Sequence, residues 1–186
     1  IQFEVVRSAL TQVTEEMAAA LRRSAYSTNV KTRQDFSCAF FDRNCKPISQ
    51  AFTQPVHLGS FVELIPTSVE AYGAENLKPG DMLVVNNPFG GGSHLNDVTV
   101  FGPVHHQNKL IGYVASLAHH VDVGGGAPAS IGPFQEIFQE GVIITPVKLV
   151  KQGEMNEDIF KLLLAQIRSK RVTAGDFRAQ VAANTV

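Results

Sequence analysis

The 186-residue sequence is poor in cysteine, with only Cys38 and Cys45. Two cysteines cannot build the disulfide framework of a small secreted domain, and the gap between them matches no zinc-ribbon spacing. We therefore expect a reduced, cytoplasmic protein. The chain also lacks an apolar run long enough to span a membrane, and its first ten residues lack the charged-then-apolar order of a signal peptide.

The sequence also has no marked excess of positive or negative residues. Sixteen Lys and Arg residues against seventeen Asp and Glu residues give a formal net charge of −1, with histidine neutral. This balance gives no reason to expect nucleic acid or an anionic membrane as a partner. The sequence has no GxxxxGK[ST] loop and no GxSxG elbow, and neither cysteine has a neighbouring histidine. Nucleotide chemistry, if the function requires it, must come from another chain.

The hydrophobic pattern predicts helices at both ends of the chain. Residues 2–25 carry one apolar stripe at three- and four-residue steps, which indicates an amphipathic helix. A further helix is expected within 58–73, where Pro66 should kink or divide it. Near the C-terminus, helices are predicted from Asn156, a plausible N-cap, and after Thr173. No interdomain linker separates these segments, and we expect residues 1–186 to form a single domain.

Between these helices, short apolar and β-branched runs predict strands. They are 35–42, 82–86, 98–104, 110–118 and 142–150, the last broken by Pro146. Residues 105–109 have the length and polarity of a hairpin loop, in which His105 and His106 are expected to be exposed. The order of helix, strands and helices predicts an α+β fold: a mixed, largely antiparallel sheet with an N-terminal amphipathic helix and C-terminal helices.

A histidine and an aspartate follow a glycine run at 90–97, in the segment GGGSHLND. Alone, the His94-x-x-Asp97 spacing is more typical of a surface loop than of a site. However, His119 and His120 end the strand that a hairpin links to the strand after Asp97, and antiparallel pairing brings these ends to one sheet edge. Imidazole and carboxylate ligands suit a divalent metal such as Mn²⁺, Zn²⁺ or Fe²⁺, and three protein ligands would leave positions open for chemistry.

Only one of the adjacent His119 and His120 can face the other ligands, because side chains alternate along a strand. The other is expected to contact substrate or support the site, with Asp122 available to orient an imidazole. Asp35 is equally an ordinary strand-end carboxylate or a further oxygen ligand. His57 is open to two interpretations as well: a buried helix residue or a site residue.

Two glutamates accompany the aromatic pair of the segment 134–138, FQEIF: Glu136 lies within it and Glu140 lies two residues after it. Either Glu136 or Glu140 could be a buried general base or an ordinary carboxylate at the edge of the core. The sequence alone does not separate these interpretations.

Several collinear blocks give the chain a family resemblance. They are FEVVRSAL, RRSAYSTNVKTRQDFSCAFFD, QPVHLGS, NNPFGGGSHLNDVTV, AHHVDVGG, EIFQEGVIITPVKL and DFRAQVAAN. With these blocks the chain resembles the N-terminal part of the hydantoinase B family. That family includes N-methylhydantoinase and 5-oxoprolinase B-type subunits, caprolactamase, and the related large subunits of acetone and acetophenone carboxylases. GSHLND resembles the hydantoinase and oxoprolinase branch more than the carboxylases.

The resemblance implies a ligand set for one divalent metal ion: Asp35, His94, Asp97 and His119. It adds Asp35 to the residues found from spacing and favours His119 over His120. We assign proton-transfer or substrate roles to His120, His57 or Glu136. The sequence departs from the family at Asn87, where the family usually has aspartate, and in length, because family members are considerably longer. We therefore expect this chain to be part of a larger subunit.

The resemblance also implies a divided reaction. An A-type partner subunit with an actin-like ATPase fold uses ATP to phosphorylate the substrate oxygen, and the B-type subunit completes a metal-dependent step. The expected reaction is ATP-dependent hydrolysis of a cyclic amide: a hydantoin, 5-oxoproline or a lactam. Two alternatives stay open: a subunit of an ATP-dependent ketone carboxylase, and a non-catalytic assembly fragment.

Overall fold

A seven-stranded sheet forms the centre of the protein in the computed structural model, which describes residues 2–51 and 53–186. Within these residues the strand order is β2-β1-β5-β4-β3-β6-β7, and each neighbouring pair is antiparallel. The strands are β1 (Phe36–Asp42), β2 (Pro47–Gln50), β3 (Met82–Val85), β4 (Asp97–His106), β5 (Lys109–His119), β6 (Val147–Lys151) and β7 (Glu154–Met155). The predicted α+β class is confirmed, with helices before and after the strands.

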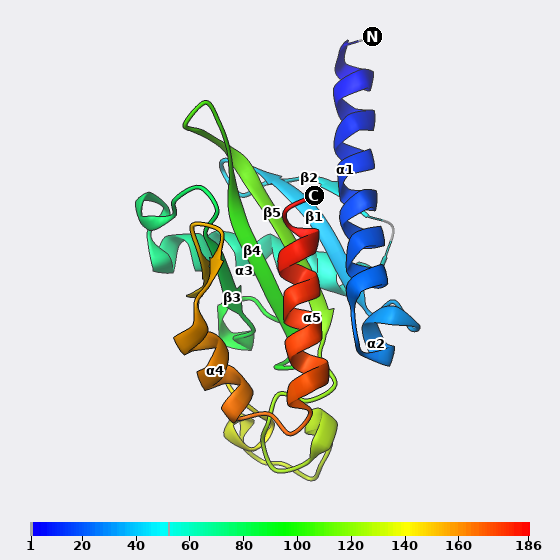
Figure 1. Cartoon of the computed structure of the whole chain (residues 1–186), viewed down its shortest axis with the longest axis vertical. Coiled ribbons are helices and arrows are strands. Elements are labelled where there is room, and N and C mark those ends of the chain that lie inside the picture. The colour runs from blue at the N-terminus through cyan, green and yellow to red at the C-terminus, as the bar shows by residue number, and fades with distance from the viewer. Residues whose placement is uncertain (1, 52) are drawn as a thin grey trace.

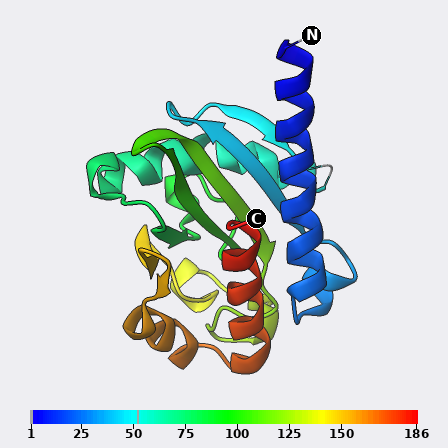
Figure 2. The same ribbon diagram turned by 45° about the horizontal axis from the view of Figure 1, so that its top comes forward.

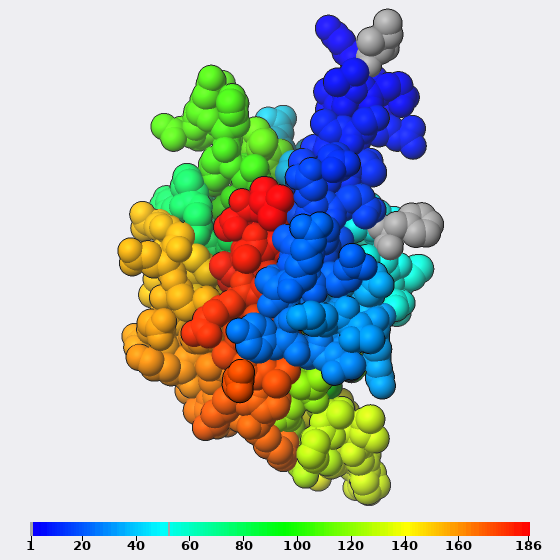
Figure 3. Space-filling view, turned by 45° about the vertical axis from the view of Figure 1, so that its right-hand side comes forward, coloured from blue at the N-terminus to red at the C-terminus, as the bar shows by residue number. Residues whose placement is uncertain are grey.

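Helices cover both faces of the sheet (Figures 1 and 2). They are α1 (Gln2–Ser24), α2 (Thr28–Lys31), α3 (Pro55–Tyr72), α4 (Glu157–Ala165) and α5 (Lys170–Ala183). One face packs against α1, α4 and α5, and the other packs against α3. In Figure 3, α5 (red) lies between α1 (blue) and α4 (orange). The sheet is therefore the middle layer of three.

Strand β1 shows why the central strands read as continuous apolar runs. Phe36, Cys38 and Phe40 join the core beneath α1 and α5. Ala39 and Phe41 point to the opposite face and pack with α3. Because side chains alternate and both faces are covered, almost every residue of the strand is buried. Cys38 and Cys45 are free thiols.

The N-terminal helix has the predicted extent, but only its second half is packed. Met17 and Leu21 are buried against β1. Phe3 and Val6 remain 75% and 57% exposed, on a part of α1 that extends beyond the sheet (Figure 1). None of the helices in the described ranges is long and apolar enough to cross a membrane.

Several local expectations were wrong. Pro66 does not divide its helix, because α3 continues through it. The helix also begins earlier than expected, at Pro55. A proline is tolerated in the first turn, where its missing N–H would have no partner within the helix. The strand expected at 142–150 begins later than predicted, because β6 covers only Val147–Lys151. Residues 142–144 instead bond to Asn86, whose side chain donates to the carbonyl of Val142 and accepts from the amide of Ile144.

The hairpin loop is shorter than the expected 105–109. Gln107 and Asn108 form the turn, with φ of 48° and 62°, the left-handed values that a two-residue loop favours. His105 and His106 belong to β4 instead, and His105 is half-buried, so the expectation that both are exposed loop residues was wrong. The short strands β2 and β7 were not predicted.

Candidate metal centre

Three chain segments meet at one edge of the sheet. Asp97 begins β4 and His119 ends β5, and the two residues are directly paired across the strands. On the other side of β5, the amide of His119 donates to the carbonyl of Asp35 at 3.0 Å, immediately before β1. The antiparallel register therefore brings Asp35, Asp97 and His119 to the same edge.

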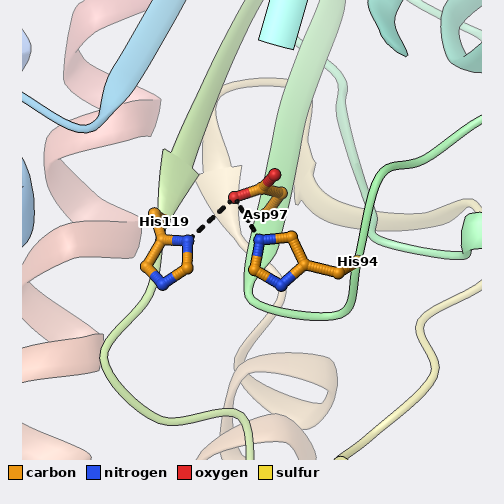
Figure 4. A group of neighbouring side chains, drawn as sticks. All are labelled: His94, Asp97 and His119. Atoms are coloured by element: carbon orange, nitrogen blue, oxygen red, sulfur yellow. Dashed lines mark hydrogen bonds and ion pairs between the residues drawn. The ribbon is translucent and has the colours of Figure 1, made fainter. Parts of the chain in front are cut away.

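Two imidazoles converge on one carboxylate oxygen at this edge (Figure 4). His94 Nε2 lies 3.2 Å from Asp97 Oδ1, and His119 Nδ1 lies 3.1 Å from the same oxygen. One potential ligand atom from each of the three residues falls within 4.8 Å of the others. A single cation could therefore contact all three side chains.

The glycine-rich loop before Asp97 must pass close to other backbone. Gly91 has φ of +100°, and a Cβ there would lie 2.6 Å from the amide nitrogen of Leu64 in α3. Thr67 Oγ1 donates to the carbonyl of Gly90 at 2.7 Å, which fixes the loop against the same helix. Glycine is needed here for its conformation and its small size. Asn87 caps the short turn that opens this loop by accepting from the amide of Phe89.

The Asp97 carboxylate is almost completely buried and held in its charged form. Burial alone would raise the pKa of Asp97, but hydrogen bonds with His119, His94 and Ser93 outweigh it and hold that pKa far below its ordinary value. The pKa of His94 is raised, chiefly by its hydrogen bond with Asp97 and against the effect of burial. The centre is therefore a buried negative charge surrounded by donors.

A third imidazole, that of His57 in α3, points its Nε2 at the carboxylates of Asp97 and Asp35. Its Nε2 lies 3.5 Å from Asp35 Oδ1 and 3.7 Å from Asp97 Oδ1, and the residue is 2% exposed. Burial lowers the pKa of His57, against the opposing effect of the two aspartates. His57 is consequently favoured in its neutral form.

The other ring nitrogen of His57 contacts a serine hydroxyl. Its Nδ1 lies 3.3 Å from Ser37 Oγ, and that hydroxyl donates to the carbonyl of Gln54. In the tautomer in which Ser37 accepts from His57 Nδ1–H, the lone pair of Nε2 faces the two carboxylates. A lone pair and two anionic oxygens directed at one another fit a site that holds a cation. This donor set of nitrogen and oxygen atoms suits a divalent metal.

The remaining predicted residues lie outside this cluster. His120 is fully buried on the opposite face, where its Nε2 lies 2.9 Å from Gln180 Oε1 and its ring packs on Phe177. Glu136 is exposed and caps a short turn. Asp122 does not orient an imidazole: its carboxylate binds Arg168 and backbone amides at the start of α5.

A cavity of about 380 Å³ opens beside the imidazoles of His94 and His119. Arg33, Asn29 and Glu140 are among the residues that line it. Sequence reasoning assigned no role to Arg33 or Asn29. The available signal was the position of Arg33, two residues before Asp35 in the block RQDFSC.

The fold and the cluster define a class: an α+β domain with a histidine–aspartate centre at the edge of an antiparallel sheet. Comparison with known sequences then assigns the family. The model of the Hydantoinase B/oxoprolinase family matches residues 1–186. The chain belongs to this family, as its sequence blocks implied.

The relatives agree with this assignment. An uncharacterized protein of Methanocaldococcus jannaschii is 43% identical, over 98% of this chain and 33% of its own length. The 5-oxoprolinase of Dictyostelium discoideum is 37% identical, over 99% of this chain and 14% of its own. A crystal structure of the ATP-dependent caprolactamase from Pseudomonas jessenii matches with a TM-score of 0.90 at 35% identity, over 99% of this chain and 32% of that one. The chain thus spans a third or less of these relatives.

Proposed function

We propose that this chain is the metal-binding part of a subunit of an ATP-dependent cyclic-amide hydrolase. The observation that carries the proposal is the convergence of His94 and His119 on one buried oxygen of Asp97. Membership of the Hydantoinase B/oxoprolinase family supports the type of reaction. Caprolactamase and 5-oxoprolinase, both named for cyclic amides, support the substrate class of hydantoins, 5-oxoproline or lactams.

In this proposal Asp35, His94, Asp97 and His119 hold one divalent ion: Mn²⁺, Zn²⁺ or Fe²⁺. When bound, such an ion supplies Lewis-acid activation of water or of a carbonyl group near neutral pH. The buried, ionised Asp97 supplies the negative charge that retains the ion, and Ser93 holds the second oxygen of this carboxylate in place. The pairing of β1, β4 and β5 keeps the ligands together before any ion binds.

His57 has the best position for a proton-transfer role among the three side chains expected to act beside the metal. Its neutral Nε2 faces the two aspartates and can accept a proton. His120 instead supports the site through its backbone: its amide donates to the carbonyl of Asn96, whose side chain donates back to the carbonyl of His120. Glu136 is exposed and receives no role in the proposal.

The proposal also requires a second protein chain. Two relatives are named as parts of larger enzymes, the beta subunit of caprolactamase and the B-type subunit of a putative D-/L-hydantoinase, which supports a hetero-oligomer. We propose that an A-type ATPase subunit of actin-like fold phosphorylates the amide oxygen of the substrate. Phosphorylation activates the amide carbon, which is a poor electrophile in an unstrained amide. Water can then add to this carbon, the C–N bond breaks to open the ring, and hydrolysis of the resulting acyl phosphate releases phosphate.

The test uses the complex of the full-length subunit with its ATPase partner. Ring opening of 5-oxoproline, hydantoin and caprolactam is measured with ATP, before and after removal of metal by a chelator. We expect activity to disappear with the metal and to return when one of the three ions is added back. Undiminished hydrolysis in the metal-free complex would contradict the proposal. Incorporation of bicarbonate into a ketone without ring opening would replace it with the carboxylase alternative.

The variants His94→Ala and Asp97→Ala separate catalysis from assembly. We expect both variants to lose metal and ring opening while still binding the ATPase partner. If the wild-type complex holds no metal and assembly is its only measurable property, the non-catalytic alternative is correct.

A further inference from the structure

The cavity beside His94 and His119 has a charged wall that the proposed metal chemistry does not use. Its volume of about 380 Å³ suits a small molecule rather than a peptide. His94 and His119 form the wall nearest the proposed metal, and Arg33, an exposed residue, also lines the cavity. A ligand in this cavity would therefore contact both the metal centre and a permanent positive charge.

The guanidinium of Arg33 is uncommitted. Throughout residues 2–51 and 53–186 it makes no side-chain hydrogen bond or ion pair. The contrast is Arg168, whose guanidinium binds Asp122 and the carbonyls of Gly124 and Gly125. An arginine that stabilises the fold has a carboxylate and backbone carbonyls as partners, as Arg168 does. Arg33 has its donors free, so they are available to a ligand.

The backbone that carries Arg33 is fixed to the proposed ligand strands. The amide of Arg33 donates to the carbonyl of Thr28, and the amide of Asp35 donates to that of Asn29. Asn29 in turn reaches the carbonyl of His119 at 3.4 Å through its side chain. The backbone of Arg33 therefore has a set position relative to Asp35 and His119, so that only its side chain has to be ordered around a ligand.

A second charged residue of the cavity lining supplies an acceptor. Glu140 lines the cavity without forming an ion pair with Arg33. The neighbouring Ala129 and Ser130 have φ of 60° and 57°, left-handed values that non-glycine residues rarely adopt. The Ser130 hydroxyl donates to the backbone carbonyl of Glu140, which fixes this strained loop in place. The cavity therefore places a cation and an anion around one small volume.

We propose that Arg33 is the anion-recognition residue of this cavity and selects ligands that carry a carboxylate or phosphoryl group. The inference rests on the proposed function, because it assigns the cavity to the substrate of the metal site. A guanidinium matches the two oxygens of such a group with two parallel hydrogen bonds. Glu140 can accept the ring N–H of a cyclic amide. The anion is either a carboxylate on the ring or the phosphoryl group that activation adds.

Binding measurements on the full-length subunit, with metal bound, test this inference without turnover. Titration calorimetry compares three probes: 5-oxoproline, 2-pyrrolidinone (the same ring without the carboxylate) and inorganic phosphate. The variants are Arg33→Gln and, as a matched loss of a nearby charge, Lys31→Gln. Lys31 is exposed on α2 and does not line the cavity.

We expect Arg33→Gln to weaken the binding of an anionic probe roughly tenfold while 2-pyrrolidinone changes little. Lys31→Gln should change each affinity by less than about twofold. If Arg33→Gln loses affinity only for 5-oxoproline, the recognised anion is the ring carboxylate. If it loses affinity only for phosphate, the recognised anion is the phosphoryl group. The inference is overturned if Arg33→Gln leaves both anionic probes unchanged, or if neither probe binds to the wild-type protein. A failure of the proposed function is seen separately, in the ring-opening assay.

Discussion

Asp97 and His119 face each other across the β4–β5 pair, with Asp97 Oδ1 3.1 Å from His119 Nδ1. Their pairing is set by the two-residue turn at Gln107 and Asn108 together with a one-residue register shift between Val104 and His105. A slip of one residue in this register would bring His120 opposite Asp97 and point the wrong imidazole at the carboxylate. The hairpin therefore determines which of two adjacent histidines can join the proposed metal centre.

The hydroxyl of Ser93 should raise the affinity of the centre for the metal without being a ligand itself. It donates to Asp97 Oδ2, the oxygen that the histidines do not share. We expect Ser93→Ala to lower the affinity for the metal roughly tenfold, because supporting hydrogen bonds orient a ligand carboxylate. Competition with a chromophoric chelator measures this in the full-length subunit. Ser24→Ala, an exposed hydroxyl on α1, is the control, and equal affinities in the two variants would contradict the prediction.

Gln180 should be important for stability because it connects α5 to the strands of the site. Its amide nitrogen donates to the carbonyls of Val98 and Ser116, and its oxygen pairs with His120 Nε2. Gln180→Leu leaves these buried groups without partners. We expect a loss of about 2–4 kcal/mol in the free energy of unfolding, measured by urea denaturation. Gln12→Leu on the exposed face of α1 should change it by less than about 0.5 kcal/mol. If Gln180→Leu left the free energy of unfolding unchanged, the prediction would be wrong, and water would have to replace the lost hydrogen bonds.

The buried Asp81–Lys148 pair predicts a pH dependence of stability. Burial would raise the pKa of Asp81, but the hydrogen bond from Lys148, at 2.7 Å, and those from the amides of Lys78 and Gln152 lower it. A carboxyl with a lowered pKa in the folded state stabilises the protein above its ordinary value of 3.8, and this contribution is lost as the pH falls through the folded pKa.

We expect Asp81→Asn to cost about 2 kcal/mol at neutral pH and progressively less in acid. Unfolding curves of wild type and variant, collected from neutral pH to below the ordinary pKa of aspartate, measure this difference. The exposed Glu154→Gln serves as the control. A difference that stays constant across the acid range would show that the charge of Asp81 is not the source of the stability.

Two glycines should respond in opposite ways to alanine. A Cβ at Gly112 would overlap the carbonyl oxygen of Phe41 in the adjacent strand, so Gly112→Ala should cost about 3 kcal/mol. Gly59, on α3, has nothing within 4 Å of such a Cβ, and Gly59→Ala should add up to about 1 kcal/mol through helix propensity. Thermal unfolding of the two variants checks the signs. Equal effects would mean that the β1–β5 spacing adapts at Gly112.

The fold could be predicted where a segment's pattern determines its own structure. The β4–β5 hairpin and α1 follow from apolar runs and periodicity alone. Residues 142–146 could not be placed, because their apolar character resembles that of a strand while their backbone bonds to the side chain of Asn86. Pro66 lies inside α3 although it cannot donate to the helix hydrogen bonds, in a part of the helix whose residues Leu64, Ile65 and Val69 belong to the core.

The residues of the candidate site also fall into two groups: those that could be predicted from the sequence and those that could not. His94, Asp97 and His119 could be proposed from spacing and hairpin topology, because strand pairing is a local rule. Asp35 needed the family resemblance. His57 could be named but not placed, since only the packing of α3 brings its Nε2 beside Asp97. The free guanidinium of Arg33 depends on which neighbours are absent, and no sequence pattern carries that information.

In the proposed metal centre, one divalent ion lies between His94, Asp97 and His119, with Asp35 as the fourth ligand. Anomalous scattering from crystals of the full-length subunit, recorded at the manganese, iron and zinc edges, locates such an ion and identifies it. We expect a single peak roughly 2.0–2.3 Å from Asp97 Oδ1 and from one nitrogen of each histidine. A peak at another location, or an active metal-loaded protein with no peak among these side chains, would contradict it.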